Sequence, residues 1–180
     1  MFTVAREGRG WEIAKVDFLA DNVTLALSDK RSGRKYAALD HGHFGVKVHR
    51  STADGWEEIA TPAYPEKPEG LEENDMWGRP LPWSTVRIWA LVAGGADEPG
   101  VLWCGTLPGG LFRSKDDGQS WQFVRSLWDH PLRKMWAGGG ADLPGIHSIL
   151  VDPRNSKQVS IAVSTGGIWH TGDAGETWTQ

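Results

Sequence analysis

The sequence predicts an all-β protein built from repeated antiparallel sheets, and a recurring phrase is the first observation behind this prediction. Residues 114–121 (SKDDGQSW) return without gaps as residues 171–178 (TGDAGETW). Weaker copies lie at residues 51–56 (STADGW) and at 2–13, where only the Gly and Trp of the phrase remain. A pattern repeated at a fixed period indicates an array of similar supersecondary units.

The spacing of the copies is the second observation. Their tryptophans are Trp11, Trp56, Trp121 and Trp178, separated by 45, 65 and 57 residues. This is the length of one four-stranded propeller blade with variable loops. The fold class is therefore a β-propeller of four-stranded antiparallel blades.

The phrase itself has the chemistry of a tight hairpin turn. It reads Ser/Thr-x-Asp-x-Gly-x-Ser/Thr-Trp. The carboxylate and the hydroxyl accept hydrogen bonds from turn N–H groups. The Gly allows a positive φ, and the Trp ring can cover the turn. We therefore expect Asp116 and Asp173 to be structural and not catalytic.

Short apolar or alternating runs bounded by turn residues predict the strands in chain order. The half blade at 1–16 supplies two strands. The predicted strands of the three blades are 23–28, 35–39, 46–50 and 56–59; 87–92, 101–105, 111–114 and 121–125; and 146–151, 158–164, 168–171 and 177–180. The inner strand 88–92 (IWALV) is wholly apolar, as expected for a sheet covered on both faces. One short helix fits within 127–137.

These elements form one predicted domain, 1–180, a partial propeller of about three and a half blades at 1–16, 23–59, 87–125 and 146–180. Closed propellers have about four to eight blades, so the ring is incomplete. Two hypotheses remain open at this point. The chain is a fragment of a longer protein, or copies associate through the open blade edges.

The repeated phrase resembles the Asp-box, or BNR repeat, of sialidases and related propellers. The resemblance implies that the phrase is a folding device on the face opposite the active site. The residues that match it are Ser114, Asp116, Gly118, Trp121, Thr171, Asp173, Gly175 and Trp178.

The wider chain is similar to bacterial sialidase-like proteins that carry BNR repeats and are described as glycosyl hydrolases. Residues 40–45 (DHGHFG), 83–89 (WSTVRIW) and 126–131 (SLWDHP) carry this resemblance. It implies a glycan-like ligand and leaves glycoside hydrolase activity open. Sialidase chemistry needs an arginine cluster, a Tyr–Glu pair and an Asp acid. No residue here matches that set well enough to be assigned as catalytic.

Composition narrows the function classes. The net charge is −4 with no basic stripe, which argues against nucleic-acid binding. Cys104 is the only cysteine, so an intrachain disulfide is excluded, and its strand position predicts a buried side chain. No signal peptide or membrane-spanning run is apparent, and we expect a cytoplasmic protein without membrane contact.

The candidate site lies in the long crossovers 60–85 and 127–145 and in the loop after residue 39, which a propeller brings to one face. Carboxylates beside aromatic rings suit a sugar. The alternative is that these tryptophans only pack the loops onto the blades. The candidate ligand-binding residues are Asp40, His41, His43, Trp83, Arg87, Trp128, Asp129, His130, Arg133, Asp142 and His147; Trp136 stands among them.

A metal site is the competing interpretation of this face. His41 and His43, with His130, His147 or Asp129, would be a tetrahedral ligand set, but two nearby histidines are a weak signal. We expect no metal and no cofactor. The predicted function is recognition of a glycan-like ligand at the channel mouth, with hydrolysis only in a complete ring. The alternative is a non-catalytic scaffold for protein partners.

Overall fold

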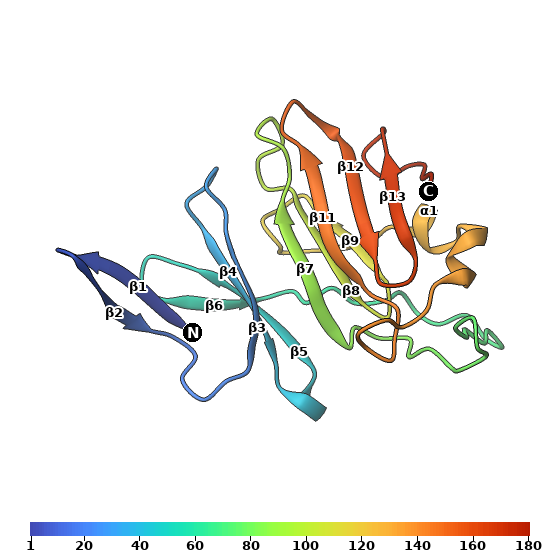
Figure 1. Ribbon diagram of the computed structural model, residues 1–180, viewed down its shortest axis with the longest axis horizontal. Helices are drawn as coiled ribbons and strands as arrows, with labels where there is room; N and C mark the ends of the chain where they lie inside the picture. Colours follow the sequence, from blue (N-terminus) through green and yellow to red (C-terminus); the bar gives the residue numbers. More distant parts are fainter.

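The computed structural model describes residues 1–180 as a row of antiparallel sheets (Figure 1). The N-terminal hairpin pairs β1 (Phe2–Glu7) with β2 (Gly10–Val16). The first sheet has the order β3 (Val23–Ser28), β4 (Lys35–Asp40), β5 (Val46–Ser51) and β6 (Trp56–Ile59). The second sheet has the order β7 (Arg87–Ala93), β8 (Leu102–Leu107), β9 (Leu111–Ser114) and β10 (Gln122–Phe123).

The third sheet contains β11 (Ile146–Asp152), β12 (Asn155–Val163) and β13 (Gly167–Thr171). The prediction of an all-β chain with four-stranded antiparallel sheets is confirmed. The predicted strand at 177–180 is wrong in extent, because it pairs only through an isolated bridge between His170 and Thr179. The assignment of the whole chain to one domain stays a prediction.

Residues 121–125 also differ from the prediction. The strand there, β10, is only two residues long, and the chain turns into helix α1 (Arg125–Trp128) and the 3-10 helix η2 (Pro131–Met135). Val124 donates the last ladder bond, to the carbonyl of Leu111. From Trp128 onward the backbone N–H groups bond to carbonyls within the helical turns, so the strand ends before them. A further 3-10 turn, η1 (Gly42–Phe44), lies between β4 and β5. No helix has the length and apolar character needed to cross a membrane.

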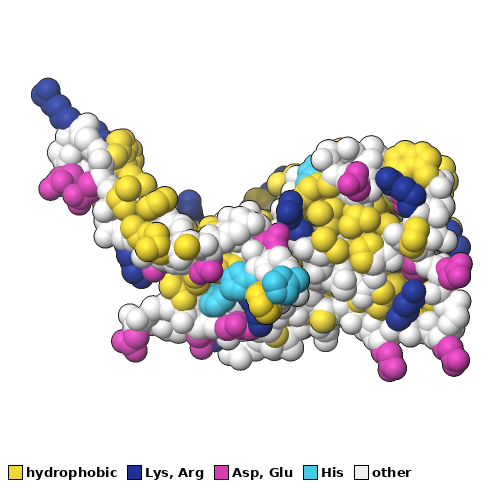
Figure 2. All heavy atoms as spheres, turned by 90° about the horizontal axis from the view of Figure 1, so that it is seen from below, with side chains coloured by type: hydrophobic (Ala, Val, Ile, Leu, Met, Phe, Trp, Pro, Cys, Tyr) yellow, Lys and Arg dark blue, Asp and Glu magenta, His cyan; other side chains and the backbone are white.

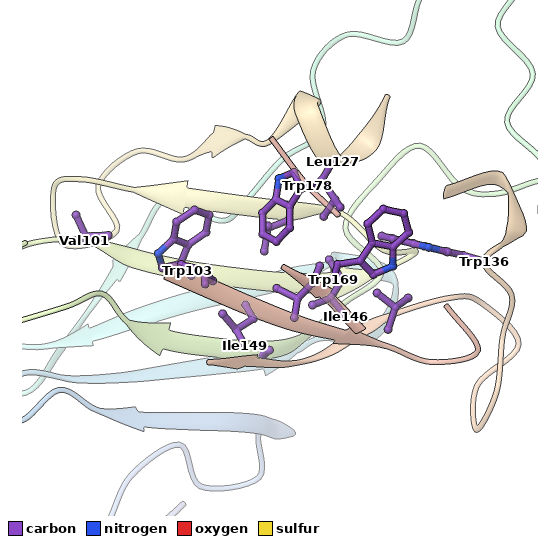
Figure 3. Close-up of a cluster of buried hydrophobic side chains, with 13 residues drawn as sticks. Val101, Trp103, Leu127, Trp136, Ile146, Ile149, Trp169 and Trp178 are labelled. Carbon is purple, nitrogen blue, oxygen red and sulfur yellow. The ribbon is translucent and has the colours of Figure 1, made fainter. Parts of the chain in front are cut away.

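The core fills both faces of the second sheet. All six residues of β8 are buried, and Leu102 and Cys104 face the first sheet while Trp103 faces the third. Figure 3 shows Trp103, Trp169 and Trp178 meeting Ile146 and Ile149 between the second and third sheets. The expectation of a buried Cys104 is confirmed. Apolar residues on both sides of one strand are what two covering sheets require.

The two strong copies of the repeated phrase fold into the same turn. The Ser114 hydroxyl donates to Asp116 Oδ1 over 2.8 Å, and the Asp116 carboxylate accepts from Ser120 N (2.9 Å) and Ser120 Oγ (2.6 Å). Gly118 has φ +84°, and a Cβ there would lie 2.7 Å from Ile59 Cδ1. The turn therefore needs glycine for both its backbone shape and its close approach to the first sheet.

The second copy has the same bonds. Thr171 Oγ1 donates to Asp173 Oδ1 (2.6 Å), and Thr177 N and Oγ1 donate to the two carboxylate oxygens over 2.9 and 2.6 Å. Both carboxylates are thus occupied by their own turn, as a structural role requires. Trp178 also closes over its turn, donating from Nε1 to Gly175 O. Trp121 instead donates to the Ala60 carbonyl of the crossover that leaves the first sheet.

A second local motif, Asp-x-Arg, occurs in two hairpin turns with the same internal geometry. Arg31 Nε lies 2.9 Å from Asp29 Oδ1, and Arg154 Nε lies 3.0 Å from Asp152 Oδ1. Their surroundings differ. Arg31 also donates to the carbonyls of Gly95, Glu98 and Val101 in the loop that connects β7 and β8 of the second sheet. Its side chain is 20% exposed, whereas that of Arg154 is 86% exposed. Arg31 therefore joins two sheets and Arg154 joins none.

We expect Arg31→Ala to lower the free energy of unfolding by about 2–4 kcal/mol. The substitution removes the guanidinium partner of three carbonyls and of the buried Asp29 carboxylate. The matched control is Arg154→Ala, which removes an exposed pair and should change the stability far less. Urea denaturation of both variants measures the difference. Equal losses for the two would contradict the assigned role of Arg31.

Acid should weaken the repeated turns. For Asp116, burial acts to raise the pKa, but hydrogen bonds from Ser120 and Ser114 outweigh it and the pKa lies below its usual value. Hydrogen bonds from Thr171 and Thr177 lower the pKa of Asp173 further. A lowered folded-state pKa contributes stability above the unfolded pKa of about 4, and this stability is lost as the pH falls through the folded-state pKa.

The double variant Asp116→Asn, Asp173→Asn should therefore be less stable than the wild type at neutral pH. Its stability should also fall less between about pH 5 and pH 2. Urea unfolding across this range tests the expectation. Asp54→Asn, in the exposed turn of a weaker copy and without a hydrogen bond to its carboxylate, is the control. An unchanged pH profile in the double variant would count against the turns as the acid-sensitive element.

Candidate functional site

Two long crossovers and the η1 loop leave the sheets at the end opposite the repeated turns, and we call this end the loop face. The crossovers are residues 60–86, between β6 and β7, and 124–145, between β10 and β11. They contact each other through an aromatic cluster centred on Tyr64. The Tyr64 ring lies 5.7 Å from Trp83, 5.5 Å from Phe112, 5.1 Å from Phe123 and 5.2 Å from Trp128.

The aromatic cluster packs the two crossovers against each other and against the second sheet. Burial raises the pKa of Tyr64, whose hydroxyl lies 3.4 Å from Thr106 Oγ1. Trp83 Nε1 donates to the carbonyl of Pro65 (2.6 Å), and Trp83 meets Trp128 edge to face at 5.5 Å. Trp128 is only 4% exposed. Its ring is therefore not free to stack on a ligand in this structure.

An arginine ties the two crossovers together beside this cluster. Arg133 places its guanidinium 3.8 Å from the centre of the Trp128 ring, and it is buried. Its NH2 group donates to Glu73 Oε2 over 2.6 Å, from the second crossover to the first. A cation stacked on an aromatic face and paired with a carboxylate holds both loops in one arrangement.

Three candidates, Asp40, His41 and Arg87, lie together on the loop face where β4 ends and β7 begins. Asp40 ends β4 and Arg87 begins β7, and their charged groups are 3.5 Å apart. Asp40 Oδ1 also accepts from Gly42 N over 2.9 Å, which shapes the η1 turn. His41 Nε2 lies 3.7 Å from Asp21 and has no hydrogen-bond partner.

The other candidates are dispersed over the loop face. His43 is exposed and stacks on Phe44, with ring centres 4.0 Å apart. His130 packs edge-on against Trp169 at 4.8 Å, and Asp129 pairs with Arg125. His147 is exposed and is bonded within its own strand to Ser148.

The last two candidates are Asp142, whose contact is made by its backbone carbonyl, and Trp136, which is packed in the core. The Asp142 carbonyl accepts from Arg79 over 2.9 Å. Trp136 is buried and packs against Trp169 at 5.5 Å. No group of three His, Cys, Asp or Glu side chains is arranged to hold a metal ion.

The arginines of the loop face are compensated pair by pair. Each of its four arginines lies within salt-bridge distance of a carboxylate: Arg79–Asp75 (2.6 Å), Arg87–Asp40 (3.5 Å), Arg125–Asp129 (3.1 Å) and Arg133–Glu73 (2.6 Å). An anionic ligand would have to compete with these carboxylates for the same guanidinium groups. The arrangement is better suited to hydroxyl groups, which accept from the arginines and donate to the carboxylates.

Three residues outside the predicted set shape this face: Tyr64, Glu73 and Trp77. Tyr64 stands between Pro62 and Pro65, and their carbonyls are bonded by Thr85 and Trp83. The Pro-rich composition could have indicated a loop of fixed shape. Nothing in the local sequence marks Glu73 as the partner of a residue 60 positions away.

We compared the sequence and the structure of the chain with those of known proteins. No protein-family model matches the chain. Over 78 residues it is 35% identical to the oligoxyloglucan-reducing end-specific xyloglucanase of Emericella nidulans, a match that covers 43% of this chain and 8% of the relative. The GH74 xyloglucanase of Xanthomonas campestris superposes with a TM-score of 0.60 at 20% identity, over 88% of this chain and 23% of that one.

YCF48 from Cyanidioschyzon merolae superposes with a TM-score of 0.53 at 15% identity, over 95% of this chain and 47% of that one. The chain thus spans less than half the length of each of these proteins. The narrower resemblance to sialidase-like BNR proteins stays a prediction. The similarities show the fold predicted from the sequence, a partial β-propeller of four-stranded antiparallel sheets.

Proposed function

We propose that the loop face of this partial propeller binds a neutral glycan. The observation that carries the proposal is the pairing of each loop-face arginine with a carboxylate. Such pairs offer donors and acceptors side by side and little net charge, which matches the hydroxyl groups of a neutral sugar. The similarity to two xyloglucanases supports a ligand of the β-glucan type.

This proposal narrows the glycan-like ligand expected from the sequence to a neutral one. Recognition of a sialic acid carboxylate needs arginines whose charge is free to meet it. Here Arg87 is shared with Asp40, and Arg133 is buried against Trp128 and Glu73. We therefore propose a neutral pyranose chain in place of an acidic sugar.

We assign binding, and not hydrolysis, to the described face. Glycoside hydrolysis needs one carboxyl group to give up a proton while a second acts as nucleophile or base. The four loop-face carboxylates that pair with arginine are held as ion-pair acceptors. We therefore assign these four carboxylates to holding the loops and not to acid–base chemistry, and we propose hydrolysis only for a more complete ring.

Isothermal titration calorimetry of the full chain tests the ligand class. We expect a xyloglucan oligosaccharide to bind with a Kd of about 1 mM or tighter, and sialyllactose to bind at least about tenfold more weakly. Raising the salt concentration should change the affinity little, because a neutral sugar carries no charge whose attraction salt could screen. Preferential binding of sialyllactose, or binding of neither sugar, would overturn the proposal.

A second candidate function, a scaffold that associates through its sheet faces, is favoured by exposed apolar side chains at both ends of the row. On the N-terminal hairpin, Phe2, Val4 and Ile13 share one exposed face with Trp11. The third sheet exposes Leu150 and Ile168. Figure 2 shows hydrophobic side chains along the projecting arm, and faces of this kind mark interaction surfaces.

Light scattering after size exclusion measures this association. We expect the wild type to show a mass that rises with concentration, and Trp11→Lys combined with Leu150→Lys to run as a monomer. Phe44→Lys, which changes an exposed apolar residue on the loop face, is the control. A wild type that stays monomeric at every concentration would exclude self-association.

A further inference from the structure

One tryptophan of the loop face stands apart from the packed cluster on a small hairpin of its own. The Trp77 hairpin is the segment 74–80 of the first crossover, closed by an antiparallel bridge between Asn74 and Pro80. Asp75 N donates to Arg79 O, and Gly78 N donates to Asp75 O, each over 2.9 Å. Gly78 takes φ +78°, which reverses the chain directly after Trp77.

The carboxylate of Asp75 holds this hairpin from inside. Its side chain is almost fully buried, and Oδ1 accepts from both Trp77 N and Arg79 N over 2.9 Å. Oδ2 accepts from Arg79 Nε over 2.6 Å. Three bonds to one carboxylate fix the backbone on both sides of Trp77, so the backbone that carries the indole is set before any ligand arrives.

The hairpin is also anchored to the rest of the loop face. Arg79 NH2 donates to the Asp142 carbonyl of the second crossover over 2.9 Å. At the base of the hairpin, Leu81 N donates to Glu73 O, and Glu73 pairs with the buried Arg133. The tip is therefore continuous with the packed aromatic cluster.

The indole of Trp77 remains open to solvent in this frame. Its exposed fraction is 59%, against 4% for Trp128. The Arg79 guanidinium lies 4.9 Å from the centre of the Trp77 ring and covers part of it. An exposed indole on a hydrogen-bonded hairpin, next to polar groups, is an arrangement that proteins use to hold a sugar ring.

We propose that Trp77 is the stacking platform for one pyranose ring of the glycan, with Arg79 and Asp142 available to its hydroxyl groups. The inference rests on the proposed function and names the part of the loop face that contacts the sugar. The apolar C–H face of a pyranose packs on the indole. A fixed platform avoids the entropy cost of ordering a loop on binding.

The experiment compares Trp77→Ala with Trp11→Ala by calorimetry with the same xyloglucan oligosaccharide. Trp11 is 72% exposed but lies on β2 of the N-terminal hairpin, outside the loop face, so it is the matched control. We expect Trp77→Ala to weaken binding about tenfold and Trp11→Ala to change it less than about twofold. Trp77→Phe should retain part of the affinity, because it keeps an aromatic face.

Arg79→Gln provides a second test, since it removes the guanidinium but leaves the indole. It should weaken binding less than Trp77→Ala. Circular dichroism melting of each variant checks that the fold is kept, which the exposure of Trp77 predicts for its two variants.

The outcomes separate the two proposals. If the wild type binds and Trp77→Ala binds equally well, the platform is wrong and the neutral-glycan function stands. If the wild type binds no neutral glycan, both proposals fall. Equal losses in Trp77→Ala and Trp11→Ala would also overturn the platform, because the effect would not be specific to the loop face.

Discussion

The packing of the second sheet between two others is the constraint on which the rest of the structure depends. Strand β8 has no solvent-facing side, so its residues must suit two different neighbours at once: Cys104 and Leu102 toward the first sheet, Trp103 toward the third. Gly105 is needed at the same interface, because a Cβ there would lie 2.6 Å from Ile146 Cγ2. Close packing of this kind sets how the sheets approach each other, and hence where their connecting loops emerge.

Local chemistry repeats along the chain, but the surroundings decide what each copy does. The Asp-x-Arg turns at Asp29 and Asp152 have matching bonds, yet only Arg31 reaches carbonyls of a neighbouring sheet. For the same reason the repeated Asp116 and Asp173 turns were predictable from the sequence, since each turn satisfies its own hydrogen bonds. Strand β9, which runs into the Asp116 turn, and strand β6, which follows the weaker copy of the phrase, were predicted with their observed ends.

The loop face was predictable in position but not in detail. Crossovers have no periodicity that separates a buried ring from an exposed one, so Trp128 and Trp77 look equivalent in the sequence. Their environments differ because Trp128 is the last residue of helix α1 and packs on Tyr64, while Trp77 sits at the tip of a hairpin held by Asp75. Contacts between residues about 60 positions apart, such as Glu73 with Arg133, depend on the sheet packing and leave no local signal.

Charge pairing connects this architecture to function. Arg133 is buried between the crossovers, and burial of a guanidinium requires a carboxylate partner, which Glu73 supplies. Arg79 is similarly bound to Asp75, whose buried side chain shapes the hairpin. The ion pairs that hold the loops in place therefore also occupy the guanidinium groups that an acidic sugar would need. A loop face built in this way is rich in hydrogen-bonding groups and leaves none of its arginines without a carboxylate partner, and it presents Trp77 as an exposed indole.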